Sequence, residues 1–374
     1  MKISQFQLER YFAKYEFSAP YLLSASDAES LSLKELLALA DKNTLALWEN
    51  LRLGYTESRG HPDLLKEISS FYERISPEAI LEIVPEEGIF IVMQALLSPG
   101  DHAIATFPGY QSLYAVAEGM GCEVSKWEPE ADPELVFNVG KLESLIRDET
   151  RLIVINFPHN PTGALPSKDQ IDEVISLARE RGITVFSDEM YRMLEYDPAE
   201  RLPAVCDLYE NSISLSGLSK SFALPGLRVG WLASQNKGFM DRFCTFKDYT
   251  TICGSAPSEI LALAALRARD QILERNLDII RTNLALLDQF FTQYGTWFRW
   301  TRPRAGTLAF PHYQGKNSVK EFCEDLLKKK GVLLVPADVF EYPHAHFRLG
   351  FGRRNMPTAL ELLAEYLEEN QQVI

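Results

Sequence analysis

The sequence predicts an α/β fold in which helices cover both faces of a mainly parallel sheet, followed by a smaller α+β domain. Through the middle of the chain, short apolar runs rich in β-branched residues alternate with amphipathic stretches of helical length. After about residue 257 this alternation gives way to a long helical region and then to shorter elements. A chain of 374 residues also exceeds the size at which one hydrophobic core usually stops growing, so two domains are expected.

Five apolar runs are the expected strands, at residues 102–106, 151–156, 183–187, 212–216 and 228–233. Residues 168–181 are an expected helix, because Ile171, Val174 and Ala178 share one face. Helices between consecutive strands are typical of a parallel sheet. Further helices are expected over 257–294 and 357–370. We place the large domain at 37–275, and the small domain at 1–36 together with 276–374.

Composition narrows the classes of protein. Hydrophobic residues make up 46% of the chain and charged residues 24%, which is an ordinary globular balance. The net charge of −14 argues against nucleic acid or an anionic membrane as partner. The N-terminus lacks the apolar core of a signal peptide, and the near-apolar stretch 89–97 is too short to span a bilayer. Five scattered cysteines without CxxC spacing indicate reduced thiols, and the expected location is cytoplasmic.

Polar side chains follow three of the expected strands. Asn156 and Asn160 come after the second strand, Asp188 and Tyr191 after the third, and Lys220 after the fourth. Ligands of open parallel sheets bind beyond the carboxyl ends of the strands. These residues are therefore expected in one crevice. A metal site is not expected, because His344 and His346 have no third ligand nearby in sequence.

The polar segments resemble a known family. NPTG at 160–163, SDEMY at 187–191 and SLSGLSKSFALPGLRVGW at 214–231 are similar to motifs of the class I/II aminotransferases, which are fold-type I pyridoxal-phosphate (PLP) enzymes. GYTESRGHPDLLKEI (54–68), ALLSPGDHAIATFPGYQSLY (95–114) and FRLGFG (347–352) follow the same order. The resemblance implies a seven-stranded sheet, PLP as cofactor and a homodimer. It also implies an aminotransferase that moves an amino group from an L-amino acid to a 2-oxo acid.

The resemblance assigns the catalytic roles. Lys220 is expected to hold PLP as a Schiff base and to move the proton during catalysis. Asp188 is expected to keep the ring nitrogen protonated, although an acid after a strand can also be a helix N-cap. Asn160 and Tyr191 resemble the pair that hydrogen-bonds the phenolic oxygen of the cofactor. A plain Asn-Pro turn is the alternative for Asn160.

Further residues are carried over in the same way. Arg228 is expected to bind the phosphate, because its guanidinium fork matches phosphate oxygens. Tyr110 should lie on the cofactor ring, or else pack in the core. Tyr55 resembles the tyrosine that reaches the phosphate of the neighbouring subunit. Arg348 resembles the arginine that binds the substrate's α-carboxylate with help from Asn160, and a rim salt bridge is its alternative.

The sequence departs from the family pattern where many relatives have a Gly- and Ser/Thr-rich phosphate-binding turn. Here Pro85, Glu86 and Glu87 begin a helix. Backbone N–H groups at this helix start could still meet the phosphate. The two acids would then face away from the cofactor, or one of them would recognise a cationic group of the substrate.

Two more departures concern the substrate pocket and the lysine loop. Gly217 occupies a position that is commonly a phosphate-binding Ser or Thr, so Ser216 or Ser219 would have to replace it. The segment containing Asp27 and Glu29 replaces a glycine-containing stretch, and these acids either read a basic side chain or lie in a surface loop.

The same residues would serve other PLP reactions. The alternative to transamination is a lyase or cyclase that uses β- or γ-elimination, replacement or ring closure. A ligand sensor fused to a DNA-binding module is disfavoured, because the chain contains no such basic module.

Overall fold

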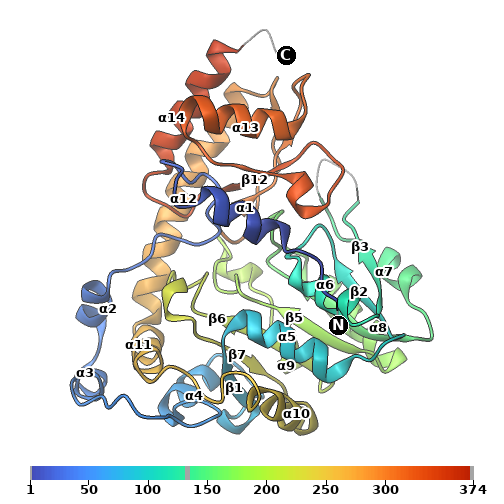
Figure 1. Cartoon of the computed structure of the whole chain (residues 1–374), viewed down its shortest axis with the longest axis vertical. Helices are drawn as coiled ribbons and strands as arrows, with labels where there is room; N and C mark the ends of the chain where they lie inside the picture. Colours follow the sequence, from blue (N-terminus) through green and yellow to red (C-terminus); the bar gives the residue numbers. More distant parts are fainter. Residues whose placement is uncertain (1, 131–134, 371–374) are drawn as a thin grey trace.

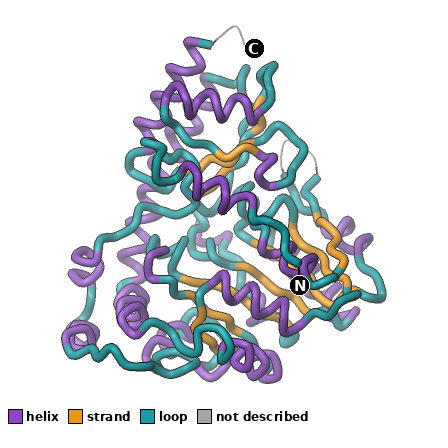
Figure 2. The backbone as a smooth tube through the Cα atoms, viewed as in Figure 1, coloured by secondary structure: helices purple, strands orange, loops and turns teal. Residues whose placement is uncertain are grey.

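The computed structural model describes residues 2–130 and 135–370. Figure 1 shows a block built around a sheet in the lower half and a second block of C-terminal elements above it. The tube in Figure 2 shows the strands of the lower block enclosed by helices. This arrangement agrees with the predicted α/β class.

Seven strands form the central sheet, in the order β1-β7-β6-β5-β4-β2-β3. Neighbouring pairs from β6 to β3 are parallel, whereas β7 runs antiparallel to both β6 and β1. The mainly parallel seven-stranded sheet implied by the sequence is confirmed. The strands are β1 (Ile80–Ile83), β2 (His102–Thr106), β3 (Glu123–Trp127), β4 (Thr150–Asn156), β5 (Thr184–Asp188), β6 (Ser212–Gly217) and β7 (Gly230–Ala233).

Two of these strands were not predicted, and both lack a continuous apolar run. Strand β3 lies at the edge of the sheet and buries only Trp127 among its five residues. Strand β1 has four residues, and its buried Glu82 interrupts the apolar pattern while it pairs with Lys247. Strand β7 begins later than predicted, because Arg228 adopts a left-handed conformation with φ 56°.

Helices cover both faces of the sheet, as the apolar strands require. One face packs against α5 (Pro85–Leu96), α6 (Ser112–Gly119) and α10 (Lys237–Lys247). The other face packs against α4 (Pro62–Ser69), α7 (Val139–Leu145), α8 (Lys168–Arg181), α9 (Val205–Leu208) and α11 (Ala256–Arg267). The bounds of α8 agree with the prediction, because Ser167 and Gln170 form a capping box and Gly182 ends the helix.

The C-terminal block has its own core. It consists of α12 (Arg269–Gln293), α13 (Val319–Lys330) and α14 (Met356–Glu369), which pack on short strands around Phe298, Phe322 and Phe347. The single helix predicted over 257–294 is two helices, α11 and α12, which meet at Ala268. The short strands are β8 (Phe298–Arg299), β9 (Leu308–Ala309), β10 (His312–Tyr313), β11 (Val335–Pro336) and β12 (Phe347–Gly350).

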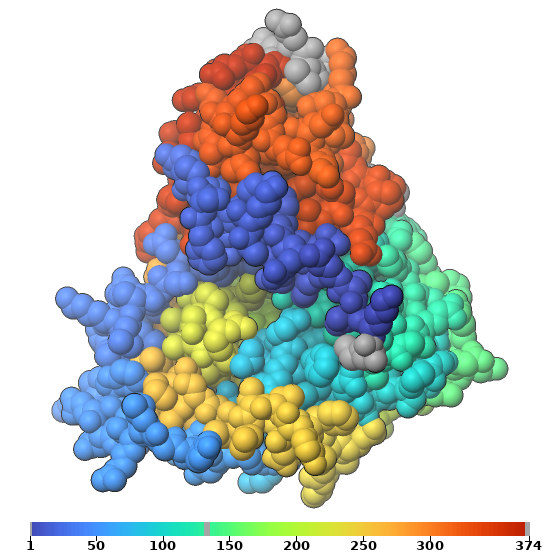
Figure 3. All heavy atoms as spheres, in the orientation of Figure 1, coloured from blue at the N-terminus to red at the C-terminus, as the bar shows by residue number. Residues whose placement is uncertain are grey.

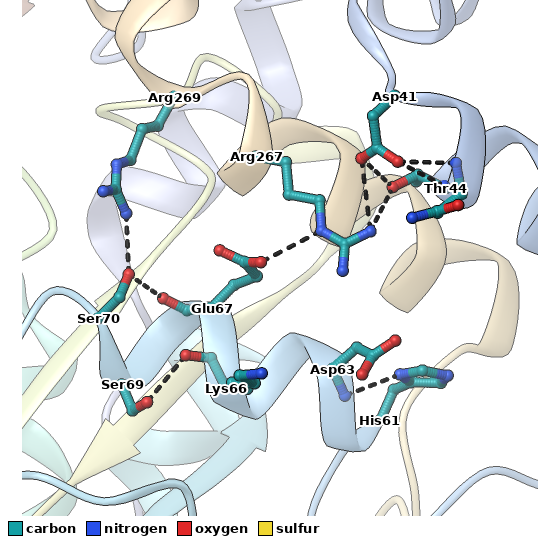
Figure 4. A network of polar contacts seen from close by, with 11 residues as sticks. Asp41, Thr44, His61, Asp63, Lys66, Glu67, Ser69, Ser70, Arg267 and Arg269 are labelled. Atoms are coloured by element: carbon teal, nitrogen blue, oxygen red, sulfur yellow. Dashed lines mark hydrogen bonds and ion pairs between the residues drawn. The ribbon is translucent and has the colours of Figure 1, made fainter.

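The N-terminal helices attach at two places. Helix α1 (Gln7–Tyr15) lies between the two blocks, where the darkest blue atoms cross the middle of the space-filling view (Figure 3). Helices α2 (Leu33–Leu39) and α3 (Lys42–Glu49) lie beside α11 in the lower block. Arg267 of α11 donates to Thr44 at 2.9 Å and to Glu67 at 3.2 Å, and so joins α3 and α4 to it (Figure 4).

The predicted domain bounds at residues 37 and 275 stay a prediction. Within the described part of the chain, no helix is both long enough and apolar enough to cross a membrane.

Candidate active site

Strand direction brings the predicted residues to one edge of the sheet. Asn156 at the end of β4 pairs in register with Asp188 at the end of β5, and β6 runs parallel beside them toward Lys220. Arg228 reaches the same edge because it precedes β7, which runs the opposite way. Parallel strands and one reversed strand therefore place an amide, a carboxylate, an amine and a guanidinium together.

A cavity of about 570 Å³ lies beyond this edge. Its wall contains Lys220 and Asp188, and most of the other residues predicted from the sequence. Pro85, Ser26 and residues of the N-terminal helix α1 complete the wall. The predicted residues that line it are Glu86, Tyr110, Asn160, Asp188, Tyr191, Ser219, Lys220, Arg228 and Arg348.

The side chain of Asn156 holds the ends of β4 and β5 in place. Its Nδ2 donates to the backbone carbonyl of Asp188 at 3.0 Å, and its Oδ1 accepts from the backbone N–H of Asn160 at 2.9 Å. Both bonds are buried, where a lost partner would leave a desolvated polar group. Asn156 therefore fixes the position of Asp188 relative to Asn160.

Asp188 is a buried acid without a cationic contact among the described residues. Its Oδ1 accepts one hydrogen bond, from the backbone N–H of Met190 at 3.1 Å. Burial raises the pKa of Asp188 to about 7, and the nearby carboxyl of Glu86 adds to the rise. A cation placed against this carboxyl would restore the ionised form. The pyridinium nitrogen of PLP is such a cation.

The amine of Lys220 is poised as a nucleophile. Its Nζ donates to the Ser26 hydroxyl at 2.7 Å, and burial lowers its pKa. The loop that carries it is fixed by the next residue, because Ser221 Oγ donates to the carbonyls of Met190 at 3.1 Å and Arg192 at 2.6 Å. The lowered pKa and the fixed loop both favour attack of this amine on an aldehyde.

Arg348 forms the far wall of the cavity and is 1% exposed. Its Nη1 donates to Asn160 Oδ1 at 3.3 Å, and its Nη2 donates to the carbonyl of Ser24 at 3.0 Å. Its guanidinium carbon lies 5.3 Å from the ring of Phe12. Nε has no hydrogen-bond partner among the described residues. A buried cation with a free N–H is suited to a carboxylate.

Tyr191 and Tyr110 also form part of the cavity wall. Tyr191 donates from its hydroxyl to the carbonyl of Ser26 at 2.8 Å, and burial raises its pKa. Tyr110 lies with its ring 5.0 Å from that of Phe6 and donates to Glu9 at 3.4 Å. Both tyrosines line the cavity, as a contact with the cofactor requires.

The opposite end of the cavity is suited to a phosphate. Arg228 lies there in a left-handed conformation, which is sparsely populated for residues other than glycine. Ser219 is 6% exposed, and its Oγ has no partner within the described residues. The first turn of α5 adds backbone N–H groups, because Val84 provides no side-chain cap. Ser219 lines the cavity whereas Ser216 does not, so a phosphate contact from Ser216 is not supported.

The acids at the start of α5 point in different directions. Glu86 lines the cavity, but Glu87 accepts a hydrogen bond from Thr251 Oγ1 at 2.9 Å and is absent from the wall. A cofactor contact from Glu87 is therefore not supported. Glu87 therefore faces away from the cavity, as one of the two expectations has it, and recognition of a cationic group by Glu86 stays a prediction.

Three other predicted residues lie apart from the cofactor space or are already paired. Tyr55 is 93% exposed on the surface and does not line the cavity. Asp27 lines it but pairs with Arg353 at 2.9 Å, and Glu29 pairs with Arg354 at 3.4 Å. The two acids of this segment are therefore neutralised by neighbouring arginines.

Sequence reasoning missed the contribution of the first 26 residues. Ser26 contacts both Lys220 and Tyr191, and Glu9, Phe12 and Glu16 of α1 line the cavity. The available signal was the spacing of Glu9, Phe12 and Glu16 by three and four residues, which puts them on one helix face.

The donor set fits PLP. The free Oγ of Ser219 and the guanidinium of Arg228 suit a phosphate, Asp188 suits a pyridinium, and the amine of Lys220 suits an aldehyde. An α/β sheet with these groups at its carboxyl edge defines a PLP-dependent enzyme.

Comparison with known proteins supports the assignment to the PLP-dependent enzymes. Residues 22–364 match the family described as aminotransferase class I and II, and the chain belongs to this family. A solved PLP-dependent aminotransferase from Streptococcus suis is 33% identical, with a TM-score of 0.92 over 99% of both chains. The PLP-dependent cyclase OrfR is 26% identical, with a TM-score of 0.89 over 99% of this chain and 98% of its own. Capreomycidine synthase of Streptomyces vinaceus is 29% identical over 75% of this chain and 72% of its own length.

The raised pKa of Asp188 predicts a pH-dependent stability of the protein freed of cofactor. The folded chain keeps a proton on Asp188 up to about pH 7, while the unfolded chain loses it near 3.8. The folded state therefore binds more protons across this window, and its stability falls as pH rises from about 4 to 7, by something on the order of 3 kcal/mol.

Urea unfolding of the apoprotein at pH 5 and pH 7.5 checks this, with Asp188→Asn as the neutral isosteric control. The wild type should lose more stability than the variant between the two values, and bound PLP should reduce that loss. Parallel behaviour of the two apoproteins would contradict the assignment.

Proposed function

We propose that this chain transfers an amino group from an L-amino acid to a 2-oxo acid, with Lys220 and Asp188 as its catalytic pair. One observation carries the proposal: an amine and a buried acid lie at the ends of neighbouring strands and face one cavity. Membership of the aminotransferase family supports the same conclusion.

When bound, PLP supplies an aldehyde that joins amines and a ring that withdraws electrons from the substrate's Cα. Asp188 holds a proton on the ring nitrogen, because the protonated nitrogen compensates the buried carboxylate. Asn156 keeps Asp188 at this position through the carbonyl of Asp188. Arg228 and Ser219 bind the phosphate, and the N-terminus of α5 adds its backbone N–H groups.

Lys220 has two tasks in the proposal. It anchors the cofactor, and once the amino group of the substrate has displaced it, its amine carries a proton away from Cα. Burial lowers its pKa, which favours the neutral amine that can accept this proton. Ser26 orients this amine through its hydroxyl, 2.7 Å away. Ser26 is thus a positioning residue that the sequence alone did not indicate.

Arg348, Asn160 and Tyr191 orient the substrate and the cofactor. Arg348 binds the α-carboxylate, for which its Nε and the edge of its guanidinium are available. Asn160 accepts from the guanidinium at 3.3 Å, and Asn160 and Tyr191, which both line the cavity, would hold the phenolic oxygen of the cofactor. Tyr110 lines the cavity and would lie on the ring of the cofactor.

A second candidate is ring closure on an amino acid. One similar protein, OrfR, is named a PLP-dependent cyclase. The same lysine and aspartate would serve both reactions, so the products decide between them.

The decisive test mixes the holoenzyme with single amino acids in the absence of an amino acceptor. We expect one equivalent of 2-oxo acid per active site and loss of the absorbance near the visible edge, because the amino group stays on the enzyme. Lys220→Ala should show neither change, and borohydride should fix pyridoxyl on the peptide that contains Lys220 in the wild type alone.

A cyclic product without 2-oxo acid would replace the aminotransferase proposal with the second candidate. Pyridoxyl on a different lysine would contradict the role of Lys220.

Arg348→Ala should raise the KM of every amino acid by a similar factor, about 10- to 100-fold, since a charge-assisted hydrogen bond to the common α-carboxylate is lost. Steady-state kinetics with several amino acids checks this. Arg348→Lys should recover part of the loss, and Arg354→Ala, which removes an exposed arginine paired with Glu29, serves as the control. An effect confined to one amino acid would reassign Arg348 to the side chain.

We further propose that the active unit is a cytoplasmic homodimer. Leu53 (85% exposed), Tyr55 and Tyr249 (90% exposed) present apolar surface. The loop of Tyr55 is tied to α11 because Thr56 donates to Glu259 at 2.6 Å. The five free thiols support a reducing compartment, which cell fractionation checks.

Sedimentation equilibrium should give a dimer, and Tyr55→Ala should weaken PLP retention if Tyr55 reaches the partner's phosphate. A fully active monomer would contradict the proposal.

A further inference from the structure

The cavity is more acidic than a PLP site requires. Its wall carries three cationic side chains and five carboxyl groups, from Lys220, Arg228 and Arg348 and from Glu9, Glu16, Asp27, Glu86 and Asp188. A phosphate and an α-carboxylate would add further negative charge. Arg228 and Arg348 are needed for those two groups, and Lys220 is committed to the cofactor.

Four of the five acids are already compensated. Asp188 faces the ring nitrogen, and Asp27 pairs with Arg353 at 2.9 Å. Glu86 lies in the first turn of α5, where the positive end of the helix dipole favours a carboxylate. Glu9 lies in the first turn of α1, so the dipole of that helix favours its carboxylate in the same way. Glu16, at the C-terminal end of α1, has no such compensation. Within the described part of the chain, neither Glu9 nor Glu16 forms an ion pair.

Glu16 is the more informative of the two. It is half-buried at the C-terminal end of α1, and its side chain has no hydrogen-bond partner among the described residues. Burial raises its pKa, and the nearby carboxyl of Asp27 adds to the rise. Glu9 accepts one hydrogen bond, from Tyr110 at 3.4 Å. A half-buried carboxylate such as that of Glu16 is stabilised by a cation that enters the cavity.

The helix face that carries these acids lies against the carboxylate-binding arginine. Phe12 is between Glu9 and Glu16 on this face, and its ring is 5.3 Å from the guanidinium carbon of Arg348. The Nε of Arg348, in a residue 1% exposed, lacks a partner among the described residues and marks where a ligand's carboxylate binds. An amino acid held there has α1 beside it, so its side chain can reach Glu9 or Glu16.

We infer that Glu9 and Glu16 bind a cationic group, a guanidinium or an ammonium, at the end of the substrate's side chain. This inference rests on the proposed function, because it concerns the substrate of the same site. A dicarboxylic amino acid would bring a like charge against both acids. A neutral side chain would leave the carboxylate of Glu16 without a partner. The substrate is therefore a basic amino acid.

The sharpest test compares L-arginine with L-citrulline, which has nearly the same shape but no charge. The holoenzyme is mixed with each, and with L-lysine and L-aspartate, and kcat/KM is taken from the loss of the cofactor's absorbance near the visible edge. Charge-assisted hydrogen bonds predict about a 10- to 100-fold preference for arginine over citrulline in the wild type. Aspartate should be the poorest of the four.

Substitutions then assign the preference to α1. Glu16→Gln and the double variant Glu9→Gln with Glu16→Gln should lower the ratio of arginine to citrulline stepwise, toward unity in the double variant, with little change for citrulline. Both sites are on a surface helix, so the fold should tolerate them. Glu87→Gln is the matched control, because it removes the same charge from an acid directed away from the cavity; its ratio should equal that of the wild type.

The outcomes separate this inference from the proposed function. Equal rates with arginine and citrulline in the wild type would overturn the inference and leave the aminotransferase proposal intact. A preference for arginine that survives in the double variant would overturn the role of α1. The proposed function would fail if the cofactor's absorbance stayed unchanged with all four amino acids and with every neutral amino acid. The inference about the substrate would then fail as well.

Discussion

The geometry of the site depends on the parallel register of β4, β5 and β6. In a strand, neighbouring side chains point to opposite faces, so a slip of β5 by one residue would turn Asp188 away from the cavity. Asn156 opposes such a slip, because its amide binds the end of β5 and the start of the Asn160 turn simultaneously. The reversed direction of β7 matters equally, since it returns Arg228 to the edge where Lys220 leaves the sheet.

The same edge of the sheet requires close packing as well as register. Gly217 and Gly230 face each other in β6 and β7, and a Cβ on Gly230 would come within 2.7 Å of the carbonyl oxygen of Ser216 and of Pro85 Cγ. Side chains at this point would push β7 and the start of α5 apart. The two glycines therefore keep Arg228 and the N-terminus of α5, which both line the cavity, close to each other.

Burial leaves several groups of the site without the partners that a stable core would give them. Asp188 has a raised pKa, Lys220 a lowered one, and Ser219 Oγ and Arg348 Nε lack hydrogen-bond partners among the described residues. Each departure costs stability in the protein without its ligands. Together they match the cation, aldehyde, phosphate and carboxylate of the cofactor and substrate. Binding of cofactor and substrate therefore provides the partners that these buried groups lack in the protein alone. Departures from the usual pairing of buried polar groups are thus concentrated at the site.

Sequence reasoning succeeded where a residue's position follows from its own strand. Asp188 and Lys220 come directly after apolar, β-branched runs, so strand direction alone placed them at the edge of the sheet. Sequence reasoning could not distinguish Glu86 from Glu87, because both residues suit the start of a helix. Only the contact with Thr251 directs Glu87 away from the cavity. The edge strand β3 was missed because partial exposure removes the apolar signal on which strand prediction depends.

The contribution of α1 was hidden for a different reason, because it depends on contacts between distant parts of the chain. Gln111 of the sheet block binds the backbone of Gln5 and Gln7 at 2.9 and 2.8 Å, while Tyr11 donates to the carbonyl of Leu334 in the C-terminal block at 2.7 Å. No local pattern encodes these bonds. These bonds attach α1 to both blocks. The packing of the two blocks therefore determines where the helix face with Glu9 and Glu16 lies in the cavity that contains Lys220. The position of the acids of α1 relative to the amine of Lys220 thus depends on this packing, and no segment of the sequence carries that information by itself.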